Sequence, residues 1–331
     1  MKSELGLIRE IRGLAGQSDP AVIRGIGDDC AVIRPASGLL QLISTDALVE
    51  NVHFDLGWHP PMQLGRKAAS VNISDIAAMA GTPRFAFLAA ALPPQTDDAW
   101  ITSFFEGFRQ VLAEHRVLLL GGDTVKSPGP LMFTVTVLGE VAEGEICYRS
   151  GARPGDLILA SGPLGSAAAG LAACRAGIPV NDSRFRQIID CHLDPLARVA
   201  LGRLLGRSGV VHAMLDSSDG LATDISHICE ESGCGAVIEA DLLPIGAETV
   251  AAARELDFDP LHLAVSGGED YQLLFTAAAA EATRLLTLCE KELRQTPVVI
   301  GRIVEGKGVV LEEKRGGRKD ITFKGYDHFK K

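Results

Sequence analysis

The feature that most constrains this chain is a set of aspartates placed directly beside apolar segments. Seven of them fall in five short clusters: Gly27-Asp28-Asp29, Ser44-Thr45-Asp46, Asn72-Ile73-Ser74-Asp75, Gly121-Gly122-Asp123-Thr124 and Asp216-Ser217-Ser218-Asp219-Gly220. A carboxylate held against an apolar strand is costly unless a cation compensates it. No comparable set of lysines or arginines is interleaved with these clusters. Hard divalent cations take oxygen ligands from Asp, Ser and Thr, so the pattern predicts a group of such ions, which usually hold phosphates.

Length and composition set the frame for this prediction. The chain has 331 residues, which favours two domains. Its residues are 47% apolar but only 5% aromatic, so we expect cores built mainly from aliphatic side chains. The net charge of -10 argues against nonspecific binding to nucleic acid or to an anionic membrane. An acidic protein can still bind phosphates where metal ions invert the local field.

The cysteines and the apolar segments indicate a cytoplasmic protein. The seven cysteines are odd in number and contain no CxxC pair, which favours free thiols in a reducing compartment. The first residues, MKSELGLIREIRG, mix charges with isolated apolar residues and do not resemble a signal peptide. The longest apolar stretch, residues 85–92, is too short to span a bilayer. We therefore expect no membrane association.

Hydrophobic periodicity predicts an α/β protein, of the α+β type, in two domains. Strands are expected at 39–45, 85–92, 116–120 and 131–138, and helices at 60–80 and 97–115. A polar stretch rich in Gly, Pro and Arg at 143–156 then places a boundary between a domain of residues 1–148 and one of residues 149–331. The second half again mixes helices with strands, at 157–160, 211–215, 271–275 and 297–303. Acid clusters are expected at strand ends in both halves, where α/β folds gather ligand sites.

Each acidic cluster also has a purely structural interpretation. Asp-Gly and Gly-Asp pairs are common in turns, and Ser218 or Asp219 could cap the helix that follows. Asp75 fits this interpretation less well, because an aspartate among apolar residues within a helix has low propensity. His53 follows Asp46 closely but could equally be a packing histidine, and Cys30 is most simply a small buried residue. Taken together, the clusters favour metal ions over independent turns.

Other nucleotide-binding and hydrolytic motifs are absent from the sequence. There is no Walker A loop, no glycine-rich dinucleotide fingerprint following a strand, no HExxH zinc motif and no GxSxG elbow. Gly25-Ile26-Gly27 and Gly121-Gly122 remain able to bring backbone close to a phosphate. A phosphate site of a different kind is therefore expected.

In order along the chain, the clusters resemble those of the thiamine-monophosphate kinase family. The segments that carry the resemblance are 25–31 (GIGDDCA), 44–46 (STD) with His53-Phe54, Lys67-Ala68, 71–75 (VNISD), 121–124 (GGDT), 149–151 (RSG), 154–156 (PGD), 218–221 (SDGL), 266–271 (SGGEDY) and 324–329 (KGYDHF). They span nearly the whole chain and are highly specific in combination. The superfamily includes aminoimidazole ribonucleotide synthetase, selenophosphate synthetase and a hydrogenase-maturation dehydratase.

The resemblance implies an architecture and a set of site residues. The amino-terminal α/β domain would pair with its copy in a homodimer to close a β-barrel, and ATP with several Mg²⁺ ions would lie in a cleft covered by the carboxyl-terminal domain. The implied metal ligands are Asp29, Ser44, Thr45, Asp46, Asp75, Asp123, Asp216 and Asp219. The implied nucleotide-binding residues are Gly122, Asp123, Arg149 and Ser218, and the implied thiamine-phosphate contacts are His53, Glu269 and Phe323. Family members often carry Trp at this last position, and Phe keeps a stacking face but lacks the N–H donor.

The implied reaction moves the γ-phosphoryl group of ATP onto thiamine monophosphate, giving ADP and thiamine diphosphate. The second pKa of the acceptor phosphate is about 6, so the acceptor needs no strong general base at neutral pH. The main obstacle is bringing two polyanions together, which favours positioning and neutralisation by metals over nucleophilic catalysis. We therefore expect in-line transfer without a covalent enzyme intermediate.

Three alternatives remain open at the level of sequence. Selenophosphate synthetase would have a reactive cysteine or selenocysteine in a glycine-rich segment near the amino terminus, and residues 1–24 contain none. The dehydratase would have a carboxyl-terminal cysteine, whereas this chain ends His328-Phe329-Lys330-Lys331. A non-catalytic nucleotide-binding protein on the same scaffold would be favoured by loss of metal-site acids, but all of them are present.

Overall fold

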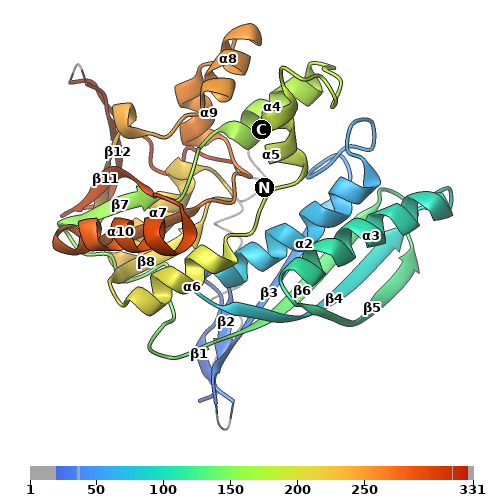
Figure 1. The fold of residues 1–331 in the computed structure, drawn as a ribbon, viewed down its shortest axis with the longest axis horizontal. Helices are drawn as coiled ribbons and strands as arrows, with labels where there is room; N and C mark the ends of the chain where they lie inside the picture. Colours follow the sequence, from blue (N-terminus) through green and yellow to red (C-terminus); the bar gives the residue numbers. More distant parts are fainter. Residues whose placement is uncertain (1–19, 36–37, 315, 327–331) are drawn as a thin grey trace.

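The computed structural model describes residues 20–35, 38–314 and 316–326. Over these residues the chain forms two sheets, one from each half, with helices packed against them (Figure 1). The mixed α/β class expected from the sequence is therefore confirmed. The segment MKSELGLIREIRG and residues 327–331, on which parts of the sequence argument depend, lie outside the described residues.

The amino-terminal sheet has six strands within the described residues, in the order β1-β2-β3-β6-β4-β5. They are β1 (Val22–Arg24), β2 (Ala31–Ile33), β3 (Leu40–Val49), β4 (Thr82–Leu92), β5 (Leu118–Lys126) and β6 (Met132–Val141). β4 and β5 run parallel, and β3, β6 and β4 are antiparallel neighbours. In the described part of the chain the sheet is open, with β1 and β5 at its edges, so a closed barrel would require a second copy.

Two helices, α2 (Pro61–Ala78) and α3 (Asp98–Glu114), cover one face of this sheet (Figure 1). Asp97 begins α3 by accepting a hydrogen bond from the Ala99 N–H, as its place before the helix predicts. The two helices approach closely at a reciprocal pair of glycines. A Cβ on Gly65 would lie 1.9 Å from the Phe104 carbonyl oxygen, and one on Gly107 would lie 1.9 Å from that of Met62. Any larger side chain at either position would push the helices apart.

The alternation of β6 gives the sheet one buried and one open face. Leu131, Phe133, Val135 and Val137 are all buried, as the sequence pattern predicts. Phe133 stacks on Phe104 of α3 with the ring centroids 3.9 Å apart. This aromatic contact fixes the helical layer on the covered face.

The expected positions of two acidic clusters at strand ends were wrong. Thr45 and Asp46 lie within β3, which continues to Val49, because residues 46–49 keep pairing with β6. Gly121, Gly122 and Asp123 likewise lie inside β5, where they pair with β4. The glycines did not end the strand because Gly122 is required within it: a Cβ there would lie 1.8 Å from the Leu88 carbonyl oxygen. Asp216 does end its strand, as expected.

The carboxyl-terminal sheet has seven strands within the described residues, in the order β13-β12-β9-β11-β7-β10-β8. They are β7 (Asp156–Ala160), β8 (Val211–Asp216), β9 (Gly235–Glu239), β10 (Leu273–Ala278), β11 (Val298–Val304), β12 (Gly308–Glu312) and β13 (Arg318–Asp320). The helices of this half are α4 (Ser166–Arg175), α5 (Arg186–Leu193), α6 (Val199–Ser208), α7 (Leu221–Ser232), α8 (Ala247–Glu255), α9 (Pro260–Ser266) and α10 (Ala282–Leu293). The cores on the sheet include side chains of α6 and α10 in one cluster and of α7 in another. The expected strands are all present, with ends shifted by a few residues.

The two halves meet where α6 packs against α2 (Figure 1). A Cβ on Gly202 would lie 2.1 Å from the Ala77 carbonyl oxygen, and a Cβ on Gly206 would lie 2.3 Å from that of Glu145. The two glycines are one helical turn apart, so they bring the same face of α6 against the amino-terminal half. Because of this close approach, α2 packs against both the amino-terminal sheet and the helix α6 of the carboxyl-terminal half.

No helix in the described ranges is both long and apolar enough to cross a membrane. All seven cysteines lie in the described part of the chain, and each is free there.

Candidate active site

A cleft with a volume of about 1280 Å³ lies where the two halves of the chain face each other. The amino-terminal half contributes β3 and one side of α2. The carboxyl-terminal half contributes the loop after β8, the loop between α9 and β10, and Phe323. All but two of the site residues expected from the sequence line this cleft, and the two exceptions are Gly122 and Asp123.

Three aspartates from three separate elements converge at the base of the cleft. Asp29, Asp75 and Asp216 each present a carboxylate oxygen, and these oxygens all lie within 4.8 Å of one another. Oδ2 of Asp29 and Oδ2 of Asp216 are buried without a hydrogen-bond partner among the described residues. Buried carboxylate oxygens without donors are strongly unfavourable. The donor set therefore fits hard divalent cations, which take several carboxylate oxygens at once.

The electrostatics of the three-aspartate cluster agree with this fit. Burial, followed by the charge of Asp29, raises the pKa of Asp216 to about 8. Burial and the charges of Asp46 and Asp216 raise the pKa of Asp75 well above its usual value. Desolvation and the charge of Asp29 raise the pKa of Asp46. Carboxylates this crowded oppose one another's ionisation, and a bound cation would remove that opposition.

One arginine partly compensates the cluster. Arg149 donates from Nη2 to Asp29 Oδ1 at 2.8 Å. Burial lowers the pKa of Arg149, but the neighbouring Asp29 raises it by more, so the guanidinium stays charged. Asp28, the neighbour of Asp29, is held by Arg24 at 2.9 Å. Burial and the charge of Asp29 raise the pKa of Asp28 to about 6, although both arginines oppose this. These arginines orient the Asp28-Asp29 pair, whereas Asp75 and Asp216 form no ion pair with any other residue that the structure describes.

The Ser44-Thr45-Asp46 segment presents alternate residues to opposite faces of the sheet. Ser44 donates a hydrogen bond to Asp75 Oδ2, and the Asp46 N–H donates to Asn72 Oδ1 at 3.2 Å. Both contacts are to α2, on the covered face. Thr45 lies on the open face, where its hydroxyl contacts the Thr136 hydroxyl at 3.0 Å. The pleat of β3 thus directs only Ser44 and Asp46 toward the three-aspartate cluster.

Gly122 and Asp123 lie outside the cleft of the single chain. Asp123 shares a cross-strand row with Ala89, Thr134 and Ala47, on the open face of the sheet. Its Oδ1 accepts a hydrogen bond from the Thr124 N–H at 2.9 Å. Two strands, β6 and β4, separate β5 from β3, which corresponds to about 14 Å between the outer strands. Within one chain Asp123 is too far from the cleft to share a metal ion with Asp46.

The loop after β8 is fixed by hydrogen bonds to the loop after α9. The Glu269 N–H donates to the Ser218 carbonyl and the Tyr271 N–H to that of Ser217, both at 2.8 Å. Gly220 makes the turn possible, since its φ of 101° is a conformation that side chains disfavour. Gly220, not Ser218 or Asp219, caps α7, and it does so without a side-chain bond. The structural interpretation of these two residues as helix caps is therefore wrong.

Asp224 is a buried acid of the cleft that the sequence analysis missed. It lies in the first turn of α7 and accepts hydrogen bonds from the Ser217 hydroxyl at 2.9 Å and the Asp219 N–H at 3.4 Å. Burial and the charge of Asp219 raise its pKa well above the usual value. The signal that pointed to Asp75, an aspartate among apolar helix residues, is present here too. Asp224 supports the loop that presents Ser218 and Asp219.

Glu269 is held by two basic side chains: Lys67, which the family resemblance included without a role, and His192, which the sequence analysis missed. Lys67 Nζ lies 2.9 Å from Glu269 Oε1, and His192 Nδ1 lies 3.0 Å from Oε2. Burial raises the pKa of Glu269, but Lys67 and His192 lower it by more, so the carboxylate stays ionised. Burial and the charge of Lys67 lower the pKa of His192, which favours its neutral form. The negative charge of Glu269 is therefore largely balanced by Lys67, whose side chain is only 1% exposed.

The remaining two expected residues lie at the rim of the same cleft. His53 Nδ1 accepts a hydrogen bond from the Val49 N–H at 3.0 Å, so in its neutral form the ring carries its proton on Nε2. The ring of Phe323 packs edge-on against the ring of His227, with the two ring centroids 5.4 Å apart. Phe323 lines the cleft from the carboxyl-terminal half of the chain. The two residues come from opposite halves of the chain, so the cleft between them is formed by both.

Comparison with known proteins agrees with this geometry. Residues 27–141 match the model for the AIR synthase related protein, N-terminal domain, and residues 153–314 match the corresponding C-terminal domain. Thiamine-monophosphate kinase from Haemophilus influenzae is 38% identical over 315 residues, covering 94% of this chain and 93% of the relative. The enzyme of the same name from Bacillus subtilis is 36% identical, covering 92% of this chain and 93% of the relative. The chain belongs to the thiamine-monophosphate kinase family.

Solved structures support the same assignment. A structure described as AaThiL complexed with AMPPCP and TMP is 30% identical, with a TM-score of 0.82 and 96% of each chain covered. Thiamine-monophosphate kinase from Stenotrophomonas maltophilia is 35% identical, with a TM-score of 0.77 over 92% of this chain and 95% of that one. The hydrogenase maturation protein HypE, at 20% identity and a TM-score of 0.73, shares the fold. As a member of the family, the chain is an enzyme of the kinase class.

Proposed function

We propose that this chain phosphorylates thiamine monophosphate to thiamine diphosphate, using ATP, by direct in-line transfer in the cleft between its two halves. The observation that carries this proposal is the convergence of carboxylate oxygens of Asp29, Asp75 and Asp216 within 4.8 Å, together with the buried Oδ2 atoms of Asp29 and Asp216, which have no donor among the described residues. In a family of thiamine-monophosphate kinases, this is the arrangement that would hold the metal ions of a nucleotide.

The residues of the cleft divide into a metal-holding and an acceptor-holding group. We propose that several Mg²⁺ ions are held by the side chains of Asp29, Ser44, Asp46, Asp75, Asp216 and Asp219. Thr45, whose hydroxyl lies on the open face of β3, is proposed to contribute through its backbone. Mg²⁺ held by these residues would neutralise phosphate charge. Arg149 and Ser218, beside the three-aspartate cluster, are proposed to contact the nucleotide.

The acceptor group consists of His53, Glu269 and Phe323. His53 presents an Nε2–H donor suited to a phosphate oxygen, and Phe323 offers an aromatic face to the cationic thiazolium. Because Lys67 already pairs with Glu269, we propose that Glu269 orients the acceptor as part of this ion pair.

The protein needs to supply little acid–base chemistry. The acceptor phosphate is largely deprotonated at neutral pH, since its second pKa is about 6. Cys30, the thiol nearest the acid clusters in sequence, has a pKa raised well above its usual value by burial and by Asp75, so it stays a thiol. No covalent enzyme intermediate is therefore proposed.

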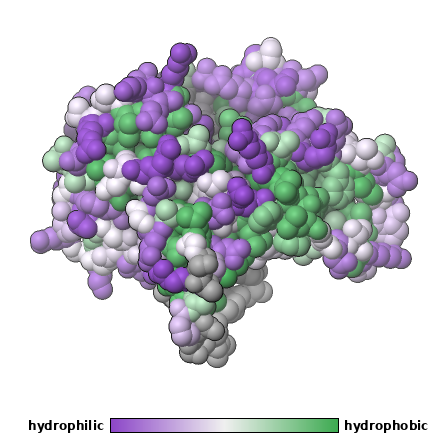
Figure 2. Space-filling view, turned by 60° about the horizontal axis from the view of Figure 1, so that its bottom comes forward, coloured by the Kyte–Doolittle hydropathy of each residue, from purple (hydrophilic) through white to green (hydrophobic). Residues whose placement is uncertain are grey.

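We further propose that the functional unit is a homodimer joined through the open face and β5 edge of the amino-terminal sheet. Figure 2 shows apolar side chains gathered on the side where Figure 1 places β4 and β5. Large exposed apolar residues there are Phe87, Leu118, Leu119, Leu120, Val125 and Met132. A second copy would cover this apolar face and the unpaired edge of β5.

This dimer also explains the position of Gly122 and Asp123. We propose that they act at the cleft of the partner subunit, because β5 lies too far from the cleft of its own chain. Mixing an Asp123→Asn variant with an Asp216→Asn variant tests this. If the two residues serve one site from different subunits, subunit exchange restores about a quarter of wild-type activity. If they serve a site within one chain, the mixture stays inactive.

Two further features of the proposal concern organisation and location. We propose that the chain divides into domains of residues 1–148 and 149–331, since the two sheets draw on opposite sides of this boundary. We also propose that the enzyme works in the cytoplasm, because free buried thiols suit a reducing compartment.

A coupled assay of ADP release tests the reaction. Thiamine monophosphate should stimulate ADP release, whereas thiamine and aminoimidazole ribonucleotide precursors should not. A protein that binds ATP, as judged by a thermal shift, but releases no ADP with any acceptor would be a non-catalytic member of the family. ADP release that depends on an aminoimidazole precursor would assign the chain to another branch of the superfamily.

A further inference from the structure

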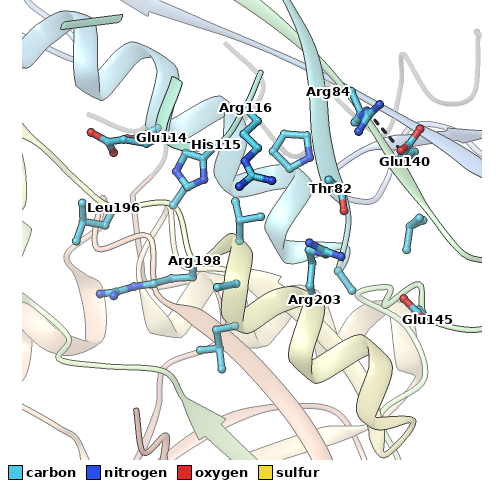
Figure 3. Close-up of a pocket in the computed structure, with 18 of the residues that line it drawn as sticks. Thr82, Arg84, Glu114, His115, Arg116, Glu140, Glu145, Leu196, Arg198 and Arg203 are labelled. Carbon is cyan, nitrogen blue, oxygen red and sulfur yellow. Dashed lines mark ion pairs between the residues drawn. The ribbon is translucent and has the colours of Figure 1, made fainter. Parts of the chain in front are cut away.

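A second cavity, with a volume of about 880 Å³, lies on the seam between the two halves. It is lined by the end of α3, the start of β4, the end of β6 and the start of α6 (Figure 3). We call this cavity the seam pocket. It shares no lining residue with the aspartate cleft, and α2 separates the two: Ser70 lines the seam pocket, while Lys67, Val71 and Asp75 line the cleft.

The seam pocket carries an excess of positive charge in a chain of net charge -10. Among its acids, Glu114 pairs with Arg66 at 2.9 Å and Glu140 pairs with Arg84 at 3.4 Å. This leaves one carboxylate, Glu145, against three guanidiniums, those of Arg116, Arg198 and Arg203. None of these three forms an ion pair with another described residue. Because Arg66 is shared with Asp194 at 2.7 Å, the lining itself, with four arginines and three glutamates, has a balance of one positive charge.

Two of the three guanidiniums face each other from different halves of the chain. Figure 3 shows Arg116 and Arg203 extending toward each other across the seam pocket, with His115 beside them. Arg116 comes from the segment that follows α3, and Arg203 comes from α6. Arg198 also lines the seam pocket, but its guanidinium extends away from the other two (Figure 3), and its Nε is buried without a partner among the described residues. Such a donor is unfavourable until an acceptor reaches it.

The amino end of α6 faces the same space. Arg198 is the N-cap residue of this ten-residue helix and makes no side-chain capping bond. Leu196, Ala197, Val199 and Ala200 all line the seam pocket, so the first N–H groups of the helix border it. Uncapped N–H groups and the positive end of the helix dipole attract anions. Backbone and side chains therefore favour the same kind of ligand.

We propose that the seam pocket binds the diphosphate group of a small molecule between Arg116, Arg203 and the amino end of α6. A diphosphate offers two adjacent anionic centres, which match two guanidiniums that approach from opposite sides, and guanidiniums bind phosphate oxygens in pairs. The diphosphate could be inorganic or part of an ester such as ADP, and both share this chemistry. A ligand held in this way connects α3 of one half to α6 of the other. The inference does not depend on the reaction proposed for the cleft.

Calorimetric titration with inorganic pyrophosphate in excess EDTA tests the proposal. Without metal ions the aspartate cleft repels an anion, so the heat reports the seam pocket. Wild-type protein should bind pyrophosphate. Arg116→Gln and Arg203→Gln should each weaken binding about 10-fold, and the double variant about 100-fold, as expected for loss of charge-assisted hydrogen bonds. Repeating the titration with ADP decides whether the site accepts a diphosphate ester or only the free anion.

Arg207→Gln is a matched control. Arg207 lies on α6 one turn beyond Arg203, faces Glu292 at 3.9 Å, and does not line the seam pocket. The Arg207→Gln substitution removes one positive charge from α6, as Arg203→Gln does, and should leave pyrophosphate affinity within about twofold of wild type. All the variants should retain wild-type turnover, since no seam residue lines the cleft. The proposal is overturned if wild-type protein binds neither anion, or if the double variant binds as tightly as the control.

Discussion

The aspartate cleft and the seam pocket lie on opposite faces of one helix and present opposite charge. The cleft has three carboxylates within 4.8 Å of one another, while the seam pocket has three guanidiniums without ion pairs among the described residues. The carboxylates of the cleft are crowded together, which is unfavourable without a cation, and the guanidiniums of the seam pocket have no carboxylate partner among the described residues. Each therefore indicates its missing partner: cations in the cleft and an anion in the seam pocket.

The comparison shows how one acidic chain can handle phosphates in two ways. In the cleft, phosphate would be held through metal ions, which also stabilise charge during transfer. In the seam pocket, phosphate would be held by fixed guanidiniums and helix N–H groups, which bind without assisting a reaction. The net charge of -10 describes neither site, because local distribution decides what each one binds.

The largest expected effect comes from removing one carboxylate of the cleft. Asp46→Asn should lower the turnover of phosphoryl transfer by about 10²–10³, because one charged metal ligand is lost. Pyrophosphate binding in EDTA should be unchanged, since Asp46 does not line the seam pocket. Steady-state ADP release and calorimetry on the same preparation measure both. Near-normal turnover in a folded Asp46→Asn protein would contradict the claim that the cleft, unlike the seam pocket, holds phosphate through metal ions.

The ion pair of Glu269 tests whether the acceptor side of the cleft depends on its internal partner. Glu269→Gln leaves Lys67, which is 1% exposed, without its counter-ion. Such a change costs about 3 kcal/mol of unfolding free energy. Glu292→Gln, at an exposed pair with Arg207, is the control and should cost less than about 1 kcal/mol. Urea denaturation at pH 7 gives both unfolding free energies. Equal losses of unfolding free energy in the two variants would show that the buried ion pair stabilises the fold no more than the exposed one.

The same substitution predicts a pH dependence. The pKa of Glu269 is lower in the folded protein than in the unfolded chain, since Lys67 and His192 outweigh burial. Its ionisation therefore stabilises the fold above the unfolded pKa of about 4.3, and this contribution is lost as the pH falls through the lower folded pKa. The stability difference between wild type and Glu269→Gln should shrink below about pH 4. A difference that grows in acid would contradict the assigned direction of the shift.

A smaller effect is expected at Phe323, on the rim of the cleft. Phe323→Ala should raise the KM for thiamine monophosphate about 10-fold, through loss of a cation–π and stacking face, with less effect on the KM for ATP. Phe323→Trp keeps that face and should be tolerated. Kinetics with each substrate varied in turn separate these effects. If the ATP constant changes and the thiamine monophosphate constant does not, Phe323 belongs to the nucleotide side.

The smallest effect is expected at Cys30, which is buried behind the aspartates. Its pKa is raised well above the usual value by burial and by Asp75, so the thiol is not a nucleophile. Cys30→Ala should keep turnover within about twofold and reduce stability by about 1 kcal/mol. Inactivation of a folded Cys30→Ala protein would require a chemical role for the thiol that the proposed transfer does not have.

Periodicity in the sequence predicted most of the secondary structure, including the strand at 131–138 that corresponds to β6 and the helix at 97–115 that corresponds to α3. It failed where glycines and polar residues continue a strand. Gly121-Gly122-Asp123 looks like a turn, but Gly122 is needed where β5 approaches the Leu88 carbonyl. Such contacts between strands far apart in the sequence leave no local signal.

The site residues also divide into those that the sequence predicts and those that only the fold reveals. The aspartates could be predicted because buried acids are costly and therefore conspicuous in any apolar context. The contacts of Lys67 and His192 with Glu269 could not be predicted, although Lys67 belongs to the family resemblance, because only the fold brings these side chains together. The seam arginines are likewise scattered along the chain, at positions 116, 198 and 203, and only the packing of α6 beside α3 and α2 makes them one feature.

The most direct test of the central claim is the metal dependence of the transfer itself, followed by ³¹P NMR. With Mg²⁺, ATP and thiamine monophosphate, the account predicts that ADP and thiamine diphosphate appear in equal amounts. Excess EDTA should abolish both signals, and Mg²⁺ added beyond the chelator should restore them, while pyrophosphate binding at the seam pocket persists throughout. Undiminished formation of thiamine diphosphate in excess EDTA would contradict the claim that the aspartates work through metal ions.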